Sequence, residues 1–463
     1  MEQPKVSVLD NGLTVITVPT NTAQPYIELN VGTGGRHETD QNSGIAHYLE
    51  HIVAGATEHM TPKEQATKTN NMRGYSNAST YFERTNYYYR VGHEHLQDAM
   101  KMIATGVQEP WFDEANVEKE RGAIVSELEM RGSNPDYISY FQFMDAAYDG
   151  NGLGRFMAGS RENIERFSAQ ELAEYMERFY TSDNMVLTVA GRVDHDEICQ
   201  MAAATFDKLP RRQQGDDYTP PHQAYRGGYK TKESAEKDDL SFSLGFEGPA
   251  DADQRDKAVA GLLASIIGGG FSSRLMEELR TKRGLVYGAS AGIQTFHDAG
   301  LFNIDAGFNS ENAEEAVNAL CDELLKVTHT ITEEELESVK NRVFGAIERT
   351  EDTEKLAKKA LNNHLAYGKF VSEEELRDLY MSVTVEEVQA YAQKLFASPP
   401  TVSAYGKGVD KVPSYEEITE RLGQKRELDA RGFCKDTAPS ADRPLGDAEV
   451  TAEPSRQKGR EVA

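Results

Sequence analysis

Cysteine is scarce in this chain of 463 residues, and tryptophan occurs once. The three cysteines, Cys199, Cys321 and Cys434, are odd in number, widely separated and not at the spacing of a structural metal site. A disulfide framework is therefore not expected, and a reducing compartment, the cytoplasm, is the expected location. The first residues, MEQPKVSVLDNGLTV, also lack the basic segment and following apolar run of a secretory signal peptide.

Long apolar runs and an excess of basic residues are missing as well. No stretch approaches the ~20 apolar residues of a transmembrane helix, so we expect no association with a membrane. Fifty Lys and Arg against 76 Asp and Glu give a formal charge of −26, which also argues against nucleic acid as a partner. The hydrophobic fraction of 38% is typical of a folded enzyme.

The order of predicted elements favours an α+β fold. The segment KVSVLDNGLTVITVP alternates apolar and polar residues around Asp10-Asn11-Gly12, which predicts a hairpin. Strands before and after runs of helices are typical of a sheet layered with helices. Further strands are predicted near 26–35, 75–81, 86–91 and 184–193, and helices near 93–107, 113–131 and 169–179.

The order of predicted elements repeats along the chain, which indicates an internal duplication. HLQDAMKMIATGVQEPWFDEANVEKERGAIVSELE and NAEEAVNALCDELLKVTHTITEEELESVKNRVFGAIER both read as an amphipathic helix, a break and a charged helix. A polar segment rich in Pro and Gly separates the two copies. We therefore predict a first domain at 1–210, a linker at 211–235, a homologous second domain at 236–424 and a disordered tail at 425–463.

Two histidines four residues apart are the most informative short pattern. In SGIAHYLEHIVAGAT, apolar residues at helical spacing follow Ser43, a candidate N-cap. His47 and His51 would then lie on one face of a helix, close enough to bind one ion, with Glu50 beside them. Two core histidines and a chance glutamate fit the pattern as well, because short motifs produce false positives.

A third ligand is needed before the pattern indicates a metal site, and EKERGAIVSELEMR offers one. Glu120 and Glu127 are seven residues apart, which places them on one face of a helix. A catalytic zinc site usually has three protein ligands and an open position. Glu-rich helices also often have solvated faces, so the spacing leaves both interpretations open.

HYLEH followed by E-x(6)-E resembles the zinc peptidases of the pitrilysin/insulinase family, whose motif is inverted relative to H-E-x-x-H. The resemblance extends over roughly residues 5–420, through DNGLTVI, NASTYFERTNYY, NMVLTVAGRV and GGGFSSRLMEELRTKRGLVYG. Two tandem domains resemble the processing-peptidase branch, which includes the mitochondrial processing peptidase. The resemblance implies two homologous domains, each a mostly antiparallel sheet layered with helices.

The resemblance also implies roles for these residues. His47, His51 and Glu127 would bind one Zn²⁺ per chain, and Glu120 would help to hold the site. Glu50 would act as the general base. Two neutral imidazoles and one carboxylate leave the ion with a net positive charge, which lowers the pKa of a bound water toward ~7.

Four further residues match substrate-binding positions of that family. Asn77 and Ala78 would lie on an edge strand to which the backbone of a peptide adds, although an ordinary polar edge residue fits Asn77 equally well. Arg280 and Tyr287, seven residues apart in RTKRGLVY, match an Arg/Tyr pair that binds substrate and helps to stabilise the oxyanion.

We therefore expect a zinc endopeptidase that cuts peptides or unstructured segments inside a closed chamber. The alternative is a non-catalytic or partner-dependent subunit of a processing-peptidase-like assembly. An S-ribosylhomocysteine lyase is remote, because its third ligand is a cysteine and none lies between His51 and Cys199. HYLEH and RTKRGLVY occur in one chain, which favours a homodimer with composite sites, or a heterodimer with a related chain.

Overall fold

The hairpin predicted at the N-terminus starts a six-stranded sheet in the computed structural model, which describes residues 3–213, 218–347 and 352–437. β1 (Lys5–Val8) pairs antiparallel with β2 (Thr14–Pro19), and Gly12 in the turn has φ 100°, a value that favours glycine. The strand order is β1-β2-β6-β3-β5-β4. Its other strands are β3 (Tyr26–Val31), β4 (Tyr75–Thr80), β5 (Thr85–Arg90) and β6 (Met185–Gly191).

A second sheet of five strands repeats this topology, and it has the order β7-β11-β8-β10-β9. The last strand of each half is inserted into the sheet and pairs in parallel with a strand from the start of that half: β6 with β2, and β11 with β7. The other described pairs are antiparallel, so the prediction of two tandem α+β domains is confirmed. The strands are β7 (Gly228–Glu233), β8 (Asp239–Glu247), β9 (Gly288–Thr295), β10 (Gly300–Asn309) and β11 (Thr401–Gly406).

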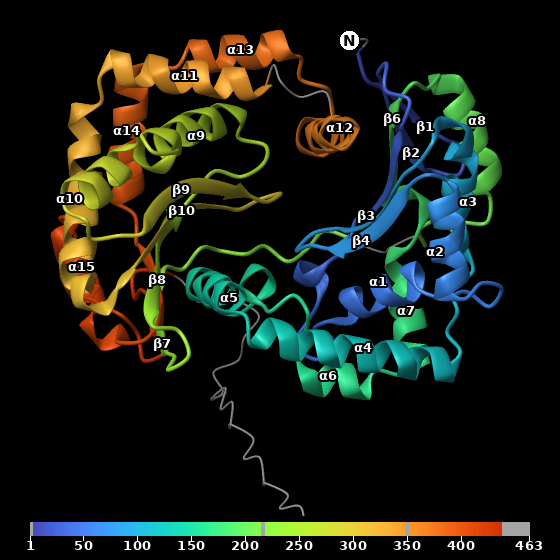
Figure 1. Cartoon of the computed structure of the whole chain (residues 1–463), viewed down its shortest axis with the longest axis horizontal. Helices are drawn as coiled ribbons and strands as arrows, with labels where there is room; N and C mark the ends of the chain where they lie inside the picture. Colours follow the sequence, from blue (N-terminus) through green and yellow to red (C-terminus); the bar gives the residue numbers. More distant parts are fainter. Residues whose placement is uncertain (1–2, 214–217, 348–351, 438–463) are drawn as a thin grey trace, which may run out of the picture.

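Helices cover both sheets (Figure 1). Those of the first half are α1 (Ile45–Ala54), α2 (Pro62–Asn71), α3 (Leu96–Gln108), α4 (Glu114–Gly132), α5 (Pro135–Tyr148), α6 (Arg161–Arg166), α7 (Ala169–Phe179) and α8 (His195–Thr205). Those of the second half are α9 (Gln254–Gly268), α10 (Ala313–Thr330), α11 (Glu333–Ile347), α12 (Thr353–Tyr367), α13 (Glu373–Met381), α14 (Val385–Phe396) and α15 (Tyr415–Arg421). Within the described ranges, no helix has the length and apolar character needed to cross a bilayer.

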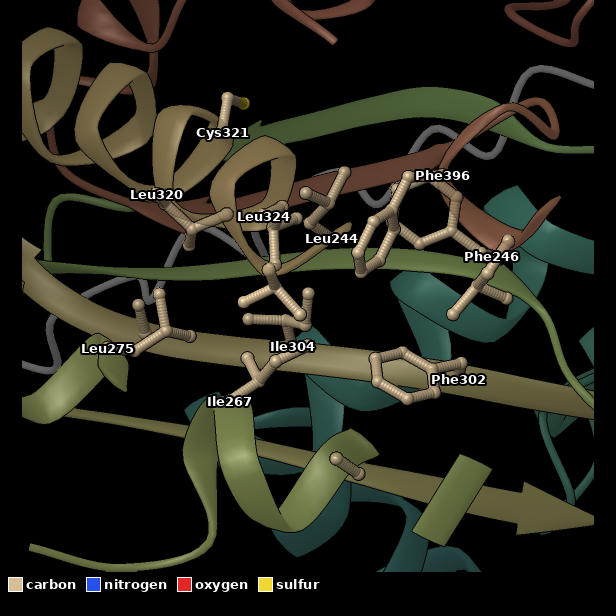
Figure 2. Close-up of a cluster of buried hydrophobic side chains, with 14 of the residues drawn as sticks. Leu244, Phe246, Ile267, Leu275, Phe302, Ile304, Leu320, Cys321, Leu324 and Phe396 are labelled. Atoms are coloured by element: carbon tan, nitrogen blue, oxygen red, sulfur yellow. The ribbon is translucent and has the colours of Figure 1, made fainter. Parts of the chain in front are cut away.

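The core of the second half follows directly from period-two alternation in its strands. Leu244 and Phe246 of β8 and Ile304 of β10 face α9, α10 and α14 (Figure 2). Each of these side chains is almost completely removed from solvent. Burying a side chain of this size contributes about 1.5–3 kcal/mol, so this face fixes the register of the sheet.

Two helices are exchanged between the halves. α5 belongs to the first half of the sequence but packs against β7, β8 and β11, and α12 of the second half packs against β2, β3 and β6 (Figure 1). In α5, the Gln142 side-chain amide donates to the carbonyl oxygens of Lys230 and Ala404, at 3.0 and 2.9 Å. In α12, Leu356 and Leu361 are buried against the first sheet. The ranges 1–210 and 236–424 therefore describe the repeat in the sequence, whereas the packing crosses their boundary.

The predicted linker and tail need correction. Residues 228–233 of the predicted linker form β7, and Tyr225 and Arg226 before it are buried. Residues 425–437 of the predicted tail are folded, since Phe433 and Cys434 are buried; Phe433 forms a β-bridge with Gly228, the first residue of β7, and Cys434 forms one with Leu428. Polar composition misled the prediction, because these segments are held by ion pairs. The remainder of the predicted tail, 438–463, lies outside the described residues.

A buried ion pair anchors this C-terminal segment. Arg226 and Asp149 are each 1% exposed, and Arg226 Nη1 donates to Asp149 Oδ2 at 2.9 Å. Arg226 Nη2 also donates to Asp429 at 3.3 Å, and Arg431 Nη1 donates to Asp149 at 3.1 Å. These ion pairs thus join the end of α5, the segment just before β7 and the C-terminal segment.

Removing one charge of this cluster should strongly destabilise the fold. Asp149→Asn keeps a residue that tolerates the φ of 57° at this position, but it leaves Arg226 without its buried partner. We expect the free energy of unfolding in urea, followed by circular dichroism, to fall by about 3 kcal/mol. The matched control is Asp322→Asn, which breaks an exposed pair with Arg421 and should cost less than about 1 kcal/mol. Equal losses in the two variants would contradict this assignment.

Candidate metal centre

Gly44 and Glu38 determine where α1, the helix that carries the HYLEH motif, begins. α1 starts after Gly44, whose φ is 95°, and a Cβ there would lie 2.8 Å from Gly159 Cα. Ser43 does not cap the helix, contrary to prediction. The Glu38 carboxylate does so instead, because it accepts hydrogen bonds from the backbone N–H groups of Gly44 (2.8 Å) and Ala46 (2.9 Å). Burial raises the pKa of Glu38 to about 7.

The three predicted ligands lie together, His47 and His51 on α1 and Glu127 on α4. Glu127 Oε2 is 3.5 Å from His47 Nε2 and 3.3 Å from His51 Nε2. Zinc–ligand bonds of ~2.0–2.1 Å in a tetrahedron place ligand atoms about 3.3 Å apart, so these atoms are spaced to surround one ion. Among the described residues, no other group of three or more His, Cys, Asp and Glu side chains has its ligand atoms all within 4.8 Å of one another.

The two imidazoles have opposite electrostatic environments. Burial, and then the neighbouring His51, lower the pKa of His47 to about 3, so its ring is neutral and available as a ligand. Burial alone would also lower the pKa of His51. The carboxylates of Glu120 and Glu127 outweigh that effect and raise the pKa to about 9. A metal ion would replace the proton of His51.

Both predicted acidic residues of α4 face His51. The contact with His51 is the largest influence on Glu127, and it lowers the pKa of that carboxyl to about 2 although burial opposes it. Glu120 Oε2 lies 3.5 Å from His51 Nδ1, on the side of the ring away from Glu127. Lys119 donates to Glu120 Oε1 at 2.8 Å. Glu120 is thus placed to orient the His51 ring rather than to bind the ion.

Glu50 stands beside the ligands without joining them. Thr80 Oγ1 of β4 donates to Glu50 Oε2 at 2.6 Å. Burial raises the pKa of the Glu50 carboxyl, which favours a group that takes up a proton during a reaction. Thr80 was missed by the sequence analysis, since it is thirty residues away and only strand pairing brings it to α1.

A pocket of about 300 Å³ opens next to this cluster. Glu50, His51 and Glu120 line it from one side, and Asn77 and Ala78 of β4 line it from another. β4 is the last strand of its sheet, so its outer edge is not paired with a described strand. Asn77 and Ala78 therefore lie on an edge strand and share a pocket with Glu50 and His51, and an edge of this kind is where an extended peptide can add as a further strand.

The structure places Arg280 and Tyr287 elsewhere. Both side chains are exposed in the second half of the chain, and neither lines the pocket beside Glu50. Tyr287 Oη donates to Asn309 at 2.6 Å, and the Arg280 guanidinium lies 5.7 Å from the ring centre of Phe271. Arg280 instead lines a separate groove of about 790 Å³ between α5 and the second sheet.

Known proteins are similar to this chain in sequence over most of its length. Residues 14–161 match the family model described as Insulinase (Peptidase family M16), and residues 166–343 match the model described as Peptidase M16 inactive domain. An uncharacterized zinc protease of Rickettsia felis is 31% identical over 413 residues, which cover 88% of this chain and 98% of that protein. The mitochondrial-processing peptidase subunit beta of Blastocladiella emersonii is 27% identical over 91% of this chain and 93% of its own length.

Solved structures share the fold. A protease from Helicobacter pylori superposes with a TM-score of 0.81 at 22% identity, over 87% of this chain and 99% of that one. A chain of Complex III2 from Candida albicans superposes with a TM-score of 0.78 at 16% identity, over 90% of this chain and 99% of that one. The family model described as Peptidase M16 inactive domain begins at residue 166, within the first half of the chain and before the predicted domain boundary at residue 210.

Metal analysis of single variants should separate the ligands from the base. We expect the purified protein to hold one zinc ion per chain by atomic emission. Glu127→Gln should lose it, because a carboxamide is a poor zinc ligand. Glu50→Gln should keep it, and Glu129→Gln on the exposed side of α4 should behave as the parent protein. Loss of zinc from Glu50→Gln would overturn the assignment of Glu50.

Proposed function

Because the chain belongs to the insulinase (M16) family of peptidases, we propose that it is a zinc-dependent endopeptidase acting on peptides or unstructured polypeptide segments. The observation that carries the proposal is the convergence of His47, His51 and Glu127, with Glu50 beside them and a pocket in front. The relatives named zinc proteases support this chemistry.

The residues at the pocket can divide the work of peptide hydrolysis. His47, His51 and Glu127 would hold zinc, which when bound polarises the peptide carbonyl and makes a water molecule more acidic. Glu50 is positioned to take a proton from the attacking water and to pass it to the leaving amine. The hydrogen bond from Thr80 keeps the carboxylate facing the pocket.

The edge strand supports an extended substrate. A peptide that pairs with β4 beside Asn77 and Ala78 would run past Glu50 with its backbone in a defined register. Only a segment without stable structure can adopt this conformation, so folded domains would be poor substrates.

Arg280 and Tyr287 support a dimeric enzyme. They lie outside the pocket beside Glu50 in their own chain, so a role at that pocket requires the pair of a second copy, related by a two-fold axis. We propose a homodimer with two composite sites in a closed chamber. A heterodimer is the second form, since the similar processing peptidase chain is named as a subunit. The free cysteines fit a cytoplasmic location.

A non-catalytic subunit is the alternative function. Similarity to a chain of Complex III2 and a match to a model named for an inactive domain favour it. The inactive-domain model covers mainly the half that lacks an H-x-x-E-H motif, whereas the first half retains the three candidate ligands and Glu50. A complete set of candidate catalytic residues favours the active enzyme.

Replacing Glu50 should abolish most of the peptidase activity without removing zinc. We expect Glu50→Gln to lower kcat on a quenched fluorescent peptide by about 10²–10⁴-fold, the usual contribution of a general base. The same cleavage sequence inside a stable folded domain should remain uncut. Full activity of zinc-loaded Glu50→Gln, or an inactive zinc-loaded parent protein tested with a broad peptide library, would contradict the proposed function.

Mixing two inactive variants tests the composite site. Glu50→Gln and Arg280→Ala should each be inactive as homodimers. A mixed dimer would have one site with both changes and one with neither, so activity should return to about half of that of the parent dimer. Continued inactivity, with subunit exchange shown by mass spectrometry, would mean that Arg280 does not act on the other chain.

A further inference from the structure

The two carboxylate oxygens of Glu127 have different partners. Oε2 faces the Nε2 atoms of His47 and His51, at 3.5 and 3.3 Å. Oε1 is paired with Nη2 of Arg131, one helical turn further along α4. Both side chains are partly exposed, with 21% and 26% of their surface accessible. The carboxylate is thus shared between the candidate metal position and a cation.

Arg131 is itself held from a second direction. Its Nη1 donates to Tyr137 Oη at 3.0 Å, and its guanidinium carbon lies 5.3 Å from the centre of the same ring. Tyr137 is in the first turn of α5, where the Asn134 side chain caps the helix by accepting from the N–H groups of Asp136 and Tyr137. The guanidinium therefore spans the break between α4 and α5.

Tyr137 is a firm support because aromatic rings surround it. Its ring centre is 4.7 Å from that of Phe141 and 5.0 Å from that of Phe156. The same cluster contains Phe82 of the first half and Phe296 of the second half. Because Tyr137 both accepts a hydrogen bond from the Arg131 guanidinium and packs against it, the Arg131 side chain has little freedom to leave Oε1.

We propose that Arg131 is a positioning residue that holds Glu127 as a ligand through one oxygen only. By occupying Oε1 it prevents the carboxylate from binding zinc with both oxygens, so that three protein ligand atoms and one water molecule would make a four-coordinate site rather than a five-coordinate one. A carboxylate without such a partner can bind a metal ion through both oxygens. The inference rests on the metal site of the proposed function.

The test uses the full-length protein loaded with Co²⁺ in place of zinc, because the visible spectrum of Co²⁺ reports its coordination number. Arg131→Met keeps an unbranched apolar side chain but removes the charge and the donors. We expect the absorptivity per bound Co²⁺ to fall by about twofold or more as the site becomes five-coordinate, since coordination geometry is diagnostic of the ligand set. Arg131→Lys, which keeps a cation near Oε1, should retain most of the parent spectrum.

The control is Arg161→Met, which removes a partly exposed guanidinium that pairs with Glu129 of the same helix. This variant should have the spectrum of the parent protein. An unchanged spectrum in Arg131→Met, or a loss of Co²⁺ with unchanged absorptivity of the ions that remain, would overturn the proposed role of Arg131. Failure of the parent protein to bind Co²⁺ or Zn²⁺ would instead overturn the metal site, so the two failures are distinguishable.

Discussion

The burial of α5 against the second sheet and of α12 against the first is the constraint on which the rest of the structure depends. Each helix packs on the sheet of the other half of the chain. Arg90 of the first half also donates a hydrogen bond to Asp352 of the second half, at 2.8 Å. α4 lies between α1 and the start of α5, so its position is fixed by both halves. Glu127 and Glu120 on α4 are thereby held in part by a helix that packs on the second sheet.

Burial also explains how the site keeps its unusual protonation states. Burial and the neighbouring His51 lower the pKa of His47, whereas contacts with the carboxylates of Glu120 and Glu127 outweigh burial and raise the pKa of His51. The packing that removes water from α1 therefore both lowers the pKa of His47 and raises the pKa of Glu50.

Patterns local in sequence were predicted well, whereas contacts between distant segments were not. The spacing of His47 and His51 placed them correctly because helical geometry alone determines it, and period-two alternation identified most of the strands. No local signal shows that Glu38 caps α1 or that Thr80 reaches Glu50, since both depend on where loops and strand edges come together. The exchange of α5 was equally hidden, because its amphipathic face does not say which sheet it covers.

A strand edge that is not paired with a described strand can also pair with another copy of the protein. The outer groups of β4 can pair with any extended chain, including a nascent or partly unfolded copy of the same protein. Many proteins protect such an edge with a bulge or a covering helix, but either device would block the pocket beside Glu50. The formal charge of −26 offers another safeguard, because mutual repulsion slows encounters between copies. An unpaired strand edge thus makes the net charge of the whole surface important for keeping the protein from aggregating.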